Sequence, residues 1–308
     1  LHIHRRLGKM PLAEVLAPAK EYARGHKLNE QQAHFLKLLH PIMTLTERGR
    51  KIYENHGSSL QSGSLLTNHN TVTFLDQISE EGDTSFYSGE IARQIHGEME
   101  EGRGLLTFED LAAYEVKERR PLSIPYRGHR FLTAPEPSMG GTLIGLSLSL
   151  MEKRGAQNHE WGSGEHLTAT VGLMSEVERL RGEGIISPVD LFHFLENSQA
   201  VDSSLENMRL FSRGTTHISV ADKDGNCASM TCSNGEGSGY IVPGTGVMLN
   251  NMMGEDDLHP DGFHSSPPGE RVYSMMSPSM LVKDGEVKLV VGSGGSKRIR
   301  IAVSQVLS

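Results

Sequence analysis

The residues with the clearest chemical potential are a glycine and two threonines at positions 214–216, followed by His217. A threonine hydroxyl is a weak nucleophile unless a base lies beside it. If the chain is cleaved just before the threonine, the freed α-amine of that same residue can serve as the base. Gly214 supplies the small preceding residue, and the strand-like pattern after Thr215 supplies a rigid support. Taken alone the pattern is weak, because threonine at the start of a strand is common.

A second candidate is the glycine-rich loop of residues 292–296, which follows a predicted strand and opens a predicted helix. Successive backbone N–H groups in such a loop can point at one place, and the dipole of the helix favours negative charge there. The loop could therefore stabilise an oxyanion. A tight strand-to-helix turn without a ligand is an equally good interpretation. The loop lacks the Gly-Lys-Ser/Thr of a nucleotide-binding loop.

Other reactive side chains favour structural interpretations. His217 follows Thr215 by two residues, so it faces the same way but lies about 6–7 Å further along the strand. This spacing favours a structural role over that of a general base. Cys227 and Cys232 are an odd number of residues apart, so they point to opposite faces and do not predict a disulfide. Five residues of types that often bind metals lie close together in the sequence: Asp256, Asp257, His259, Asp261 and His264. Their spacing matches no local metal-binding signature, so a polar loop is the better interpretation.

The elements that must position these residues change in type along the chain. Apolar periodicity predicts helices over residues 11–24, 31–40, 71–78, 87–99, 142–152 and 166–181, with short ones opening at Thr107-x-x-Asp110 and at Ser187-Pro188. Strands are predicted over 122–126, 129–133, 217–221, 227–233, 246–249, 279–283 and 287–291, before a closing helix. Helices packed on antiparallel strands are therefore expected.

Composition excludes some classes of partner. The net charge of −8 argues against nucleic acid and against an anionic membrane surface. No apolar stretch is long enough to span a bilayer. The chain starts at Leu1 rather than Met and ends within an apolar pattern that has no cap. We therefore expect it to be the interior of a longer protein.

Several motifs, in the right order, resemble the γ-glutamyltransferase family of N-terminal-nucleophile hydrolases. Residues 215–251, 273–278 (YSMMSP) and 292–299 (GSGGSKRI) resemble the start of its small subunit, and residues 8–19, 86–92, 104–115 and 137–142 (PSMGGT) resemble its large subunit. The resemblance implies an α+β fold, specifically a four-layer αββα sandwich. It assigns residues 1–214 to the C-terminal part of the large-subunit region and 215–308 to the N-terminal part of the small-subunit region, together forming one domain.

The resemblance also implies roles for single residues. Thr215 matches the nucleophile, Gly214–Thr215 matches the self-cleavage junction, and Thr216 matches a neighbour whose hydroxyl supports the new α-amine. Ser233 falls where the family has a hydroxyl that bonds the nucleophile. The remaining matches are to residues that bind the substrate. Asn234, after a short deletion, matches a residue that holds the γ-glutamyl group, Glu255 one that binds its α-ammonium, and Ser274 one that binds its α-carboxylate. Gly295 and Ser296 match the pair that forms the oxyanion hole.

The implied activity is that of a self-processing γ-glutamyl hydrolase or transferase. It would cleave the γ-glutamyl amide of glutathione and related compounds through a threonine acyl-enzyme, with water, an amino acid or a peptide as acceptor. Neither a cofactor nor a metal is expected. The large and small subunits would come from one precursor. The family is often exported, which favours the periplasm or the extracellular space.

Two departures from the family pattern leave alternatives open. Met275 replaces the second serine of a pair that holds the carboxylate, and Met252 stands where the family often has a polar residue. Losing a hydrogen bond to a charged group costs about 1.5–3 kcal/mol. One alternative is therefore a related acylase that takes another side chain, such as a glutaryl-type amide. The other is a non-catalytic homologue that has kept the fold.

Overall fold

The computed structural model describes residues 1–155, 158–182, 184, 188–190, 214–255, 258–259, 262 and 265–308. It divides into two compact units: a helical unit, Leu1–Glu118 with Glu236–Asn251, and a sheet unit, Arg119–Gly235 with Met252–Ser308. Each unit contains residues from both sides of the Gly214–Thr215 bond. The predicted boundary between residues 214 and 215 concerns cleavage of the chain and stays a prediction. Among the described helices, none has the length and apolar character that a bilayer crossing requires.

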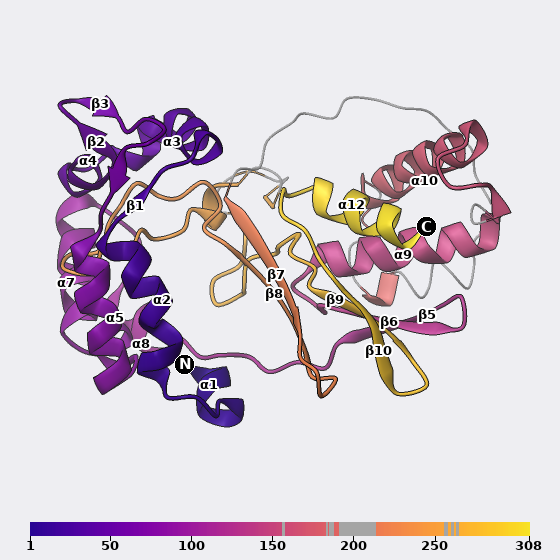
Figure 1. Ribbon diagram of the computed structural model, residues 1–308, viewed down its shortest axis with the longest axis horizontal. Coiled ribbons are helices and arrows are strands. Elements are labelled where there is room, and N and C mark those ends of the chain that lie inside the picture. Colours follow the sequence, from indigo (N-terminus) through magenta and orange to yellow (C-terminus); the bar gives the residue numbers. More distant parts are fainter. Residues whose placement is uncertain are drawn as a thin grey trace. The chain divides into compact units, whose positions relative to one another are not determined.

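The helical unit consists of short helices joined by two small antiparallel ladders (Figure 1). The ladders pair β1 (His26–Lys27) with β4 (Leu65–Leu66), and β2 (Glu54–Asn55) with β3 (Ser58–Ser59). The helices are α1 (His2–Leu7), α2 (Leu12–Arg24), α3 (Glu30–Met43), α4 (Glu47–Tyr53), α5 (His69–Glu81), α6 (Thr84–Tyr87), α7 (Glu90–Gly102) and α8 (Phe108–Ala112).

Local sequence signals account for several of these helices. The predicted cap of α8 is confirmed: Thr107 Oγ1 accepts from the backbone N–H of Asp110 at 3.1 Å, and the Asp110 carboxylate accepts from that of Thr107 at 2.9 Å. Such a box satisfies two N–H groups that the first helical turn leaves unpaired. On α7, the predicted apolar face is buried, with Ile95 0% exposed. These helices thus follow from capping and periodicity.

The segment Glu236–Asn251 returns to the helical unit as a loop, and the strand predicted over residues 246–249 is wrong. Within it Ile241 and Met248 form an isolated bridge, and none of its residues belongs to a strand. Its glycines at 237, 239, 244 and 246 have φ values of +90°, +75°, +69° and +65°. Because this conformation turns the chain, the segment bends too often to extend.

The sheet unit is built on a four-stranded antiparallel sheet in the order β10-β9-β6-β5. The hairpin of β5 (Leu122–Tyr126) and β6 (His129–Thr133) has the predicted bounds, as does β9 (Ser279–Lys283), whereas β10 (Glu286–Val291) starts one residue earlier. The pairing of β6 with β9 joins residues far apart in the sequence, with Thr133 opposite Ser279. This long-range pairing places the C-terminal segments beside the first hairpin.

The sheet unit contains α9 (Met139–Arg154), α10 (Gly164–Gly182) and α12 (Arg298–Leu307). Helix α9 packs against β5, and α10 and α12 pack on α9 (Figure 1). The nearly all-apolar α9 is buried as predicted, and its Leu143 and Leu146 are 0% exposed. They share one hydrophobic cluster with Phe131 of β6 and Ile299 of α12. Burial of each such side chain stabilises the fold by about 1.5–3 kcal/mol. The helix predicted to open at Ser187 falls mostly outside the described residues.

A separate hairpin pairs β7 (Thr215–Ala221) with β8 (Cys227–Ser233). Its turn is closed by Asp222, whose Oδ1 accepts from the backbone N–H groups of Asp224 and Asn226, each at 2.9 Å. Both cysteines in β8 are free. One face of the hairpin is exposed although it is largely apolar; it carries Thr216, Ile218, Val220, Ala228, Met230 and Cys232.

Candidate active site

Thr215 is the first residue of β7 and is half-buried. Antiparallel pairing places it opposite Ser233, the last residue of β8. Its hydroxyl donates a hydrogen bond to Ser233 Oγ at 3.1 Å. The backbone N–H of Gly235 donates to the same oxygen at 3.0 Å. The two hydroxyls therefore meet, and the backbone fixes the oxygen that Thr215 contacts.

The glycine-rich loop of residues 292–296 lies against the inner face of β7. A Cβ atom on Gly292 would collide with the ring of His217, and one on Gly294 would lie 2.5 Å from the carbonyl oxygen of Thr215. Both positions are far inside van der Waals contact, so only glycine permits this close approach. The two-residue spacing of the glycines matches the strand period that makes His217 and Thr215 face the same way. The loop is thus in direct contact with Thr215.

The end of this loop is sharply bent. Gly295 and Ser296 have φ values of +115° and +48°. Their carbonyl oxygens accept from the backbone N–H groups of Arg298 and Ile299, each at 3.0 Å, at the start of α12. A positive φ is uncommon for a residue other than glycine and is found most often where function requires it. The bend buries Ser296, which is 8% exposed.

A small hollow in the sheet unit brings four predicted site residues together. Thr215 and Ser233 line it together with Glu255 and Ser296. Hydrogen bonds and charge interactions are stronger where apolar side chains exclude water. The arrangement can therefore support attack by a hydroxyl on a bound carbonyl group, with one carboxylate nearby for a cationic group. Its apolar walls are formed by Met252, Leu258, Met275, Met276 and Ile299.

Five other predicted residues, among them the half-buried Gly214, are not among the described residues that line this hollow. Thr216 is exposed on the opposite face of β7, because successive strand residues alternate. Asn234 is exposed directly after β8, whereas Gly295 is buried beside Ser296. Ser274 is half-buried in a bridge to Ser138. Their roles in binding or catalysis stay predictions.

The two motifs at residues 137–142 and 273–278 bind each other. The backbone N–H of Ser274 donates to the Pro137 carbonyl at 2.9 Å, and Ser138 Oγ donates to the Met276 carbonyl at 2.7 Å. A Cβ on Gly140 would collide with the Met275 carbonyl. The first motif therefore fixes the backbone of Met275 and Met276, which form part of the hollow's wall.

His217 has the structural role that its spacing predicts. Its Nδ1 lies 2.8 Å from Thr231 Oγ1 and its Nε2 lies 2.9 Å from Ser219 Oγ, so both ring nitrogens bond within the hairpin. Burial lowers the pKa of His217 because it disfavours the charged imidazolium. A neutral ring with both nitrogens engaged is poorly placed to take a proton from Thr215.

The group of possible metal ligands at residues 256–264 lies mostly outside the described residues. Its described member, His259, is 6% exposed, with Nε2 3.3 Å from the Met252 carbonyl oxygen and Nδ1 3.3 Å from Ser266 Oγ. Within the described part of the chain, no three His, Cys, Asp or Glu residues gather as a metal site would require. The remaining members, Asp256, Asp257, Asp261 and His264, are not described.

The family model of gamma-glutamyltranspeptidase matches residues 1–183 and 194–308. The chain belongs to this family. It is 31% identical over 342 residues to the glutathione hydrolase proenzyme of Escherichia coli K12, with 98% of the chain and 58% of that protein covered. It is 30% identical over 341 residues to the proenzyme of the same name from Pseudomonas aeruginosa, with 99% and 60% covered.

Solved structures support the same fold. The chain is similar to the cephalosporin acylase of Bacillus halodurans, with a TM-score of 0.79, 25% identity, and 99% of the chain and 60% of that structure covered. It is also similar to the gamma-glutamyltranspeptidase of Helicobacter pylori, with a TM-score of 0.55, 27% identity, and 61% and 56% covered. The α+β fold expected for the family is therefore confirmed. The chain spans about three fifths of the length of these relatives.

Some residues around the hollow were missed in the sequence. Leu258, Met276 and Ile299 contribute to its walls. A signal existed for Met276, which lies inside the recognised YSMMSP motif, and for Ile299, an apolar residue at the start of the predicted closing helix. Leu258 gave none, because one apolar residue in a polar segment does not indicate where that segment packs.

Proposed function

We propose that this protein is a self-processing γ-glutamyl hydrolase or transferase in which Thr215 is both the cleavage site and the nucleophile. One observation carries the proposal. Thr215 begins a strand, its hydroxyl bonds to Ser233, and its carbonyl group contacts the glycine loop at Gly294. These contacts fix the threonine on both sides, as covalent catalysis by a weakly acidic hydroxyl requires.

The proposed maturation breaks the Gly214–Thr215 bond. The Thr215 hydroxyl attacks the Gly214 carbonyl carbon, and the peptide C–N bond breaks as the acyl group moves from nitrogen to oxygen. Water then hydrolyses the resulting ester, which leaves a carboxylate on Gly214 and a free α-amine on Thr215. Residues 1–214 and 215–308 would thereafter belong to separate large and small subunits from one precursor.

In turnover, the free α-amine takes the proton of the Thr215 hydroxyl, directly or through water. The hydroxyl oxygen attacks the γ-carbonyl carbon of the substrate, the amide C–N bond breaks, and the departing amine receives the proton. The backbone N–H groups of Gly295 and Ser296 hold the oxyanion, a contribution of about 2.7–4 kcal/mol per donor in other enzymes. Water, an amino acid or a peptide then resolves the acyl-enzyme.

The substrate class follows from the names of the relatives and from the matched residues. Glutathione hydrolase proenzymes are among the most similar proteins. Glu255 lines the hollow, where a carboxylate suits the α-ammonium of a γ-glutamyl group. Asn234 and Ser274 complete the proposed contacts to the glutamyl group, and Thr216 is proposed to support the α-amine after cleavage. Glutathione and related γ-glutamyl compounds are therefore the proposed substrates.

The finer architecture that we propose is the four-layer αββα sandwich, with the described chain as part of it. Helix α9 packs against β5 of the four-stranded sheet, and α10 and α12 pack on α9 within one hydrophobic cluster. The hairpin of β7 and β8 contacts β10, where Ser229 Oγ donates to the Val291 carbonyl at 3.4 Å. The outer face of the hairpin is exposed, and Ile218, Val220 and Met230 are 46%, 55% and 51% exposed. Such a face is what a further layer of helices would cover.

The methionines in the hollow favour a second candidate function. Met252 and Met275 line it where the family often has polar residues, and Met275 is 4% exposed. A related acylase would accept an acyl group that lacks the α-ammonium, as a glutaryl group does while keeping its carboxylate. The chain is 29% identical to acylase ACY 1 proenzyme from a Pseudomonas species. Hydrolysis rates of γ-glutamyl and glutaryl anilides discriminate: faster γ-glutamyl cleavage supports the first function, and faster glutaryl cleavage supports the acylase.

Intact mass of the purified full-length protein after overnight incubation tests self-processing. We expect two fragments, the smaller beginning at Thr215. A single uncut chain that also releases no amine from either anilide contradicts the proposal and supports a non-catalytic homologue. The mass identifies the cleavage site to the residue, which separates self-cleavage at Thr215 from adventitious proteolysis elsewhere.

A further inference from the structure

The loop Glu236–Asn251 belongs to the helical unit, but the chain segments on both sides of it lead to the hollow. Ser233, which contacts the Thr215 hydroxyl, lies just before the loop. Met252, which lines the hollow, comes directly after it, and Glu255 follows on the same segment. The chain therefore leaves the hollow at one end of this loop and returns to it at the other. Whatever fixes the two ends of the loop also constrains those two segments.

Asn251 joins the two ends of the loop. Its side-chain oxygen Oδ1 accepts from the backbone N–H of Glu236 at 2.8 Å and from that of Gly237 at 3.2 Å. One amide side chain thus links the last residue of the loop to its first two residues. Because backbone N–H groups that lose an acceptor must find another partner, these two bonds resist separation of the loop ends.

The middle of the loop is held by burial in the helical unit. Ile241 is 1% exposed and Val242 is 0% exposed. Val242 shares a hydrophobic cluster with Ile91 and Ile95 of α7 and with Phe74 of α5. Because cores of this kind are close-packed, a shift of Val242 would open a void or create a clash. The loop is therefore anchored at its centre as well as at its ends.

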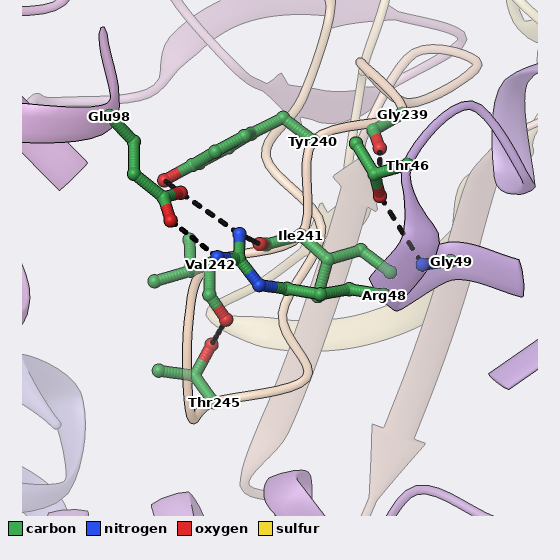
Figure 2. Close-up of polar contacts among 9 residues, drawn as sticks. All are labelled: Thr46, Arg48, Gly49, Glu98, Gly239, Tyr240, Ile241, Val242 and Thr245. Carbon is green, nitrogen blue, oxygen red and sulfur yellow. Dashed lines mark hydrogen bonds and ion pairs between the residues drawn. The ribbon is translucent and has the colours of Figure 1, made fainter. Parts of the chain in front are cut away.

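A polar cluster beside this core holds the same stretch (Figure 2). Arg48 of α4 forms a two-pronged ion pair with Glu98 of α7, and its Nη1 also donates to the Ile241 carbonyl at 3.1 Å. The Tyr240 hydroxyl donates to Glu98 Oε2 at 2.7 Å. Bonds with an ionised partner are shorter and stronger than neutral ones. The loop is thus linked at Tyr240 and Ile241 to two helices.

The charges in this cluster keep each group in the state that the contacts require. The hydrogen bond from Arg48 holds the pKa of Glu98 below its ordinary value, so the carboxylate stays ionised near neutral pH. Burial and the adjacent Glu98 raise the pKa of Tyr240, so its hydroxyl keeps the proton that it donates.

The far end of the loop is fixed by α5 and the residue before it. Asn68 Nδ2 donates to the Gly246 carbonyl at 3.0 Å, and Thr71 Oγ1 donates to the Thr245 carbonyl at 3.2 Å. A Cβ on Gly246 would collide with the Asn68 side chain. Apolar burial, the ion-pair cluster and the amide and hydroxyl donors all hold this loop within the helical unit. The loop therefore forms a stiff connection between the two segments that lead to the hollow.

We propose that Asn251 is a positioning residue for the active site: by joining the two ends of the loop, its side-chain oxygen sets Ser233 and Glu255 at their places beside Thr215. The contacts among Arg48, Glu98 and Tyr240 hold the body of the loop within the helical unit. This inference rests on the proposed function, which assigns Ser233 and Glu255 to the site. Asn251 itself touches no reacting atom in this scheme.

The kinetic test compares Asn251→Leu with Asn251→Asp in the full-length protein. Leucine has similar size but no acceptor, and aspartate restores acceptor oxygens. Because two hydrogen bonds are lost and Glu255 shifts, we expect Asn251→Leu to raise KM for a γ-glutamyl anilide about tenfold or more, with a smaller fall in kcat. Asn251→Asp should recover most of that loss. Asn29→Leu is the matched control, because Asn29 Oδ1 also accepts a backbone N–H at 2.8 Å but only caps α3.

A second measurement is independent of activity. Hydrogen exchange in the Thr215→Ala background should rise upon Asn251→Leu in residues 229–235 and 252–255, and stay unchanged in the hairpin of β5 and β6. An unchanged KM together with unchanged exchange in both segments overturns the proposal, as does an equal effect of Asn29→Leu. If the wild-type protein is neither cleaved nor active, the proposed function fails, and the exchange pattern alone decides the positioning role.

Discussion

The glycine loop of residues 292–296 and the loop Glu236–Asn251 are held in contrasting ways. The first approaches Thr215 through bare backbone, and a Cβ on Gly292 or Gly294 would collide with β7. The second is held by side chains: an ion pair, hydroxyl and amide donors, and the buried Ile241 and Val242. Backbone contact leaves no room for adjustment. Side-chain contacts can be lost one at a time. Each single substitution in the second loop should therefore lower stability by only a small amount.

The largest effect is expected for Thr215→Ala, because it removes the attacking oxygen. Cleavage at Gly214–Thr215 should stop, and kcat should fall by about 10⁴-fold or more. Thr215→Ser keeps the hydroxyl and should retain measurable cleavage. Intact mass and anilide hydrolysis measure the two processes. A processed and active Thr215→Ala protein would sink the assignment of the nucleophile.

A large loss of cleavage and turnover is also expected for Gly294→Ala. The new Cβ would lie 2.5 Å from the Thr215 carbonyl oxygen, so the loop and the strand must separate. A displacement of about 1 Å at a reacting group can cost about 10²-fold in rate. We expect slower cleavage and turnover by about that factor.

The matched control is Gly172→Ala, at a helical position in α10 where nothing lies within 4 Å of the added Cβ. It should leave activity intact and raise the free energy of unfolding by about 0.5–1 kcal/mol, since alanine favours the helix. Equal activity of Gly294→Ala and Gly172→Ala would contradict the close contact between loop and nucleophile.

A smaller effect is expected for Tyr240→Phe in the second loop. The ring keeps its place in the core, while the 2.7 Å bond to Glu98 is lost. Removing one such bond costs about 0.5–1.5 kcal/mol, or slightly more because the acceptor is charged. Urea denaturation measures this change. Tyr22→Phe, at a residue that is 65% exposed, should change the free energy of unfolding by less than about 0.5 kcal/mol. Equal values for the two variants would mean that the hydroxyl of Tyr240 does not hold the loop.

The smallest effect is expected on the pH dependence of stability. The pKa of Glu98 is lowered by Arg48, so the ion pair stabilises the fold fully above the unfolded pKa of about 4.3. That contribution is lost as the pH falls through the folded pKa. The Arg48 and Glu98 side chains are 41% and 30% exposed, so solvent limits the pair to about 1 kcal/mol.

The melting temperatures of wild type and Glu98→Gln should therefore differ at pH 7 and converge as the pH falls through the lowered pKa of Glu98. A difference in melting temperature that grows as the pH falls would contradict a stabilising ion pair between Arg48 and Glu98.

Much of the local structure could be predicted. The hairpin of β5 and β6, the cap of α8 and the burial of α9 each follow from signals within about twenty residues. The prediction failed at residues 246–249, where a short apolar run looked like a strand. Local pattern does not reveal that Val247 and Leu249 pack on the helical unit's core from a bent loop. Arg48 and Glu98 gave no signal either, because charged helix residues are usually solvent-exposed. Tyr240 gave none because it lies in a loop.

The sequence by itself determined the family, the order of the motifs and the identity of Thr215 as the candidate nucleophile. These rest on residue types and short spacings, which need no knowledge of the fold. Only the tertiary structure decided that Gly294 lies against the Thr215 carbonyl, that residues 137–142 fix residues 273–278, and that Asn251 links the ends of a loop. Such contacts join residues distant along the chain, and they depend on how the intervening elements fill space, which no local pattern records.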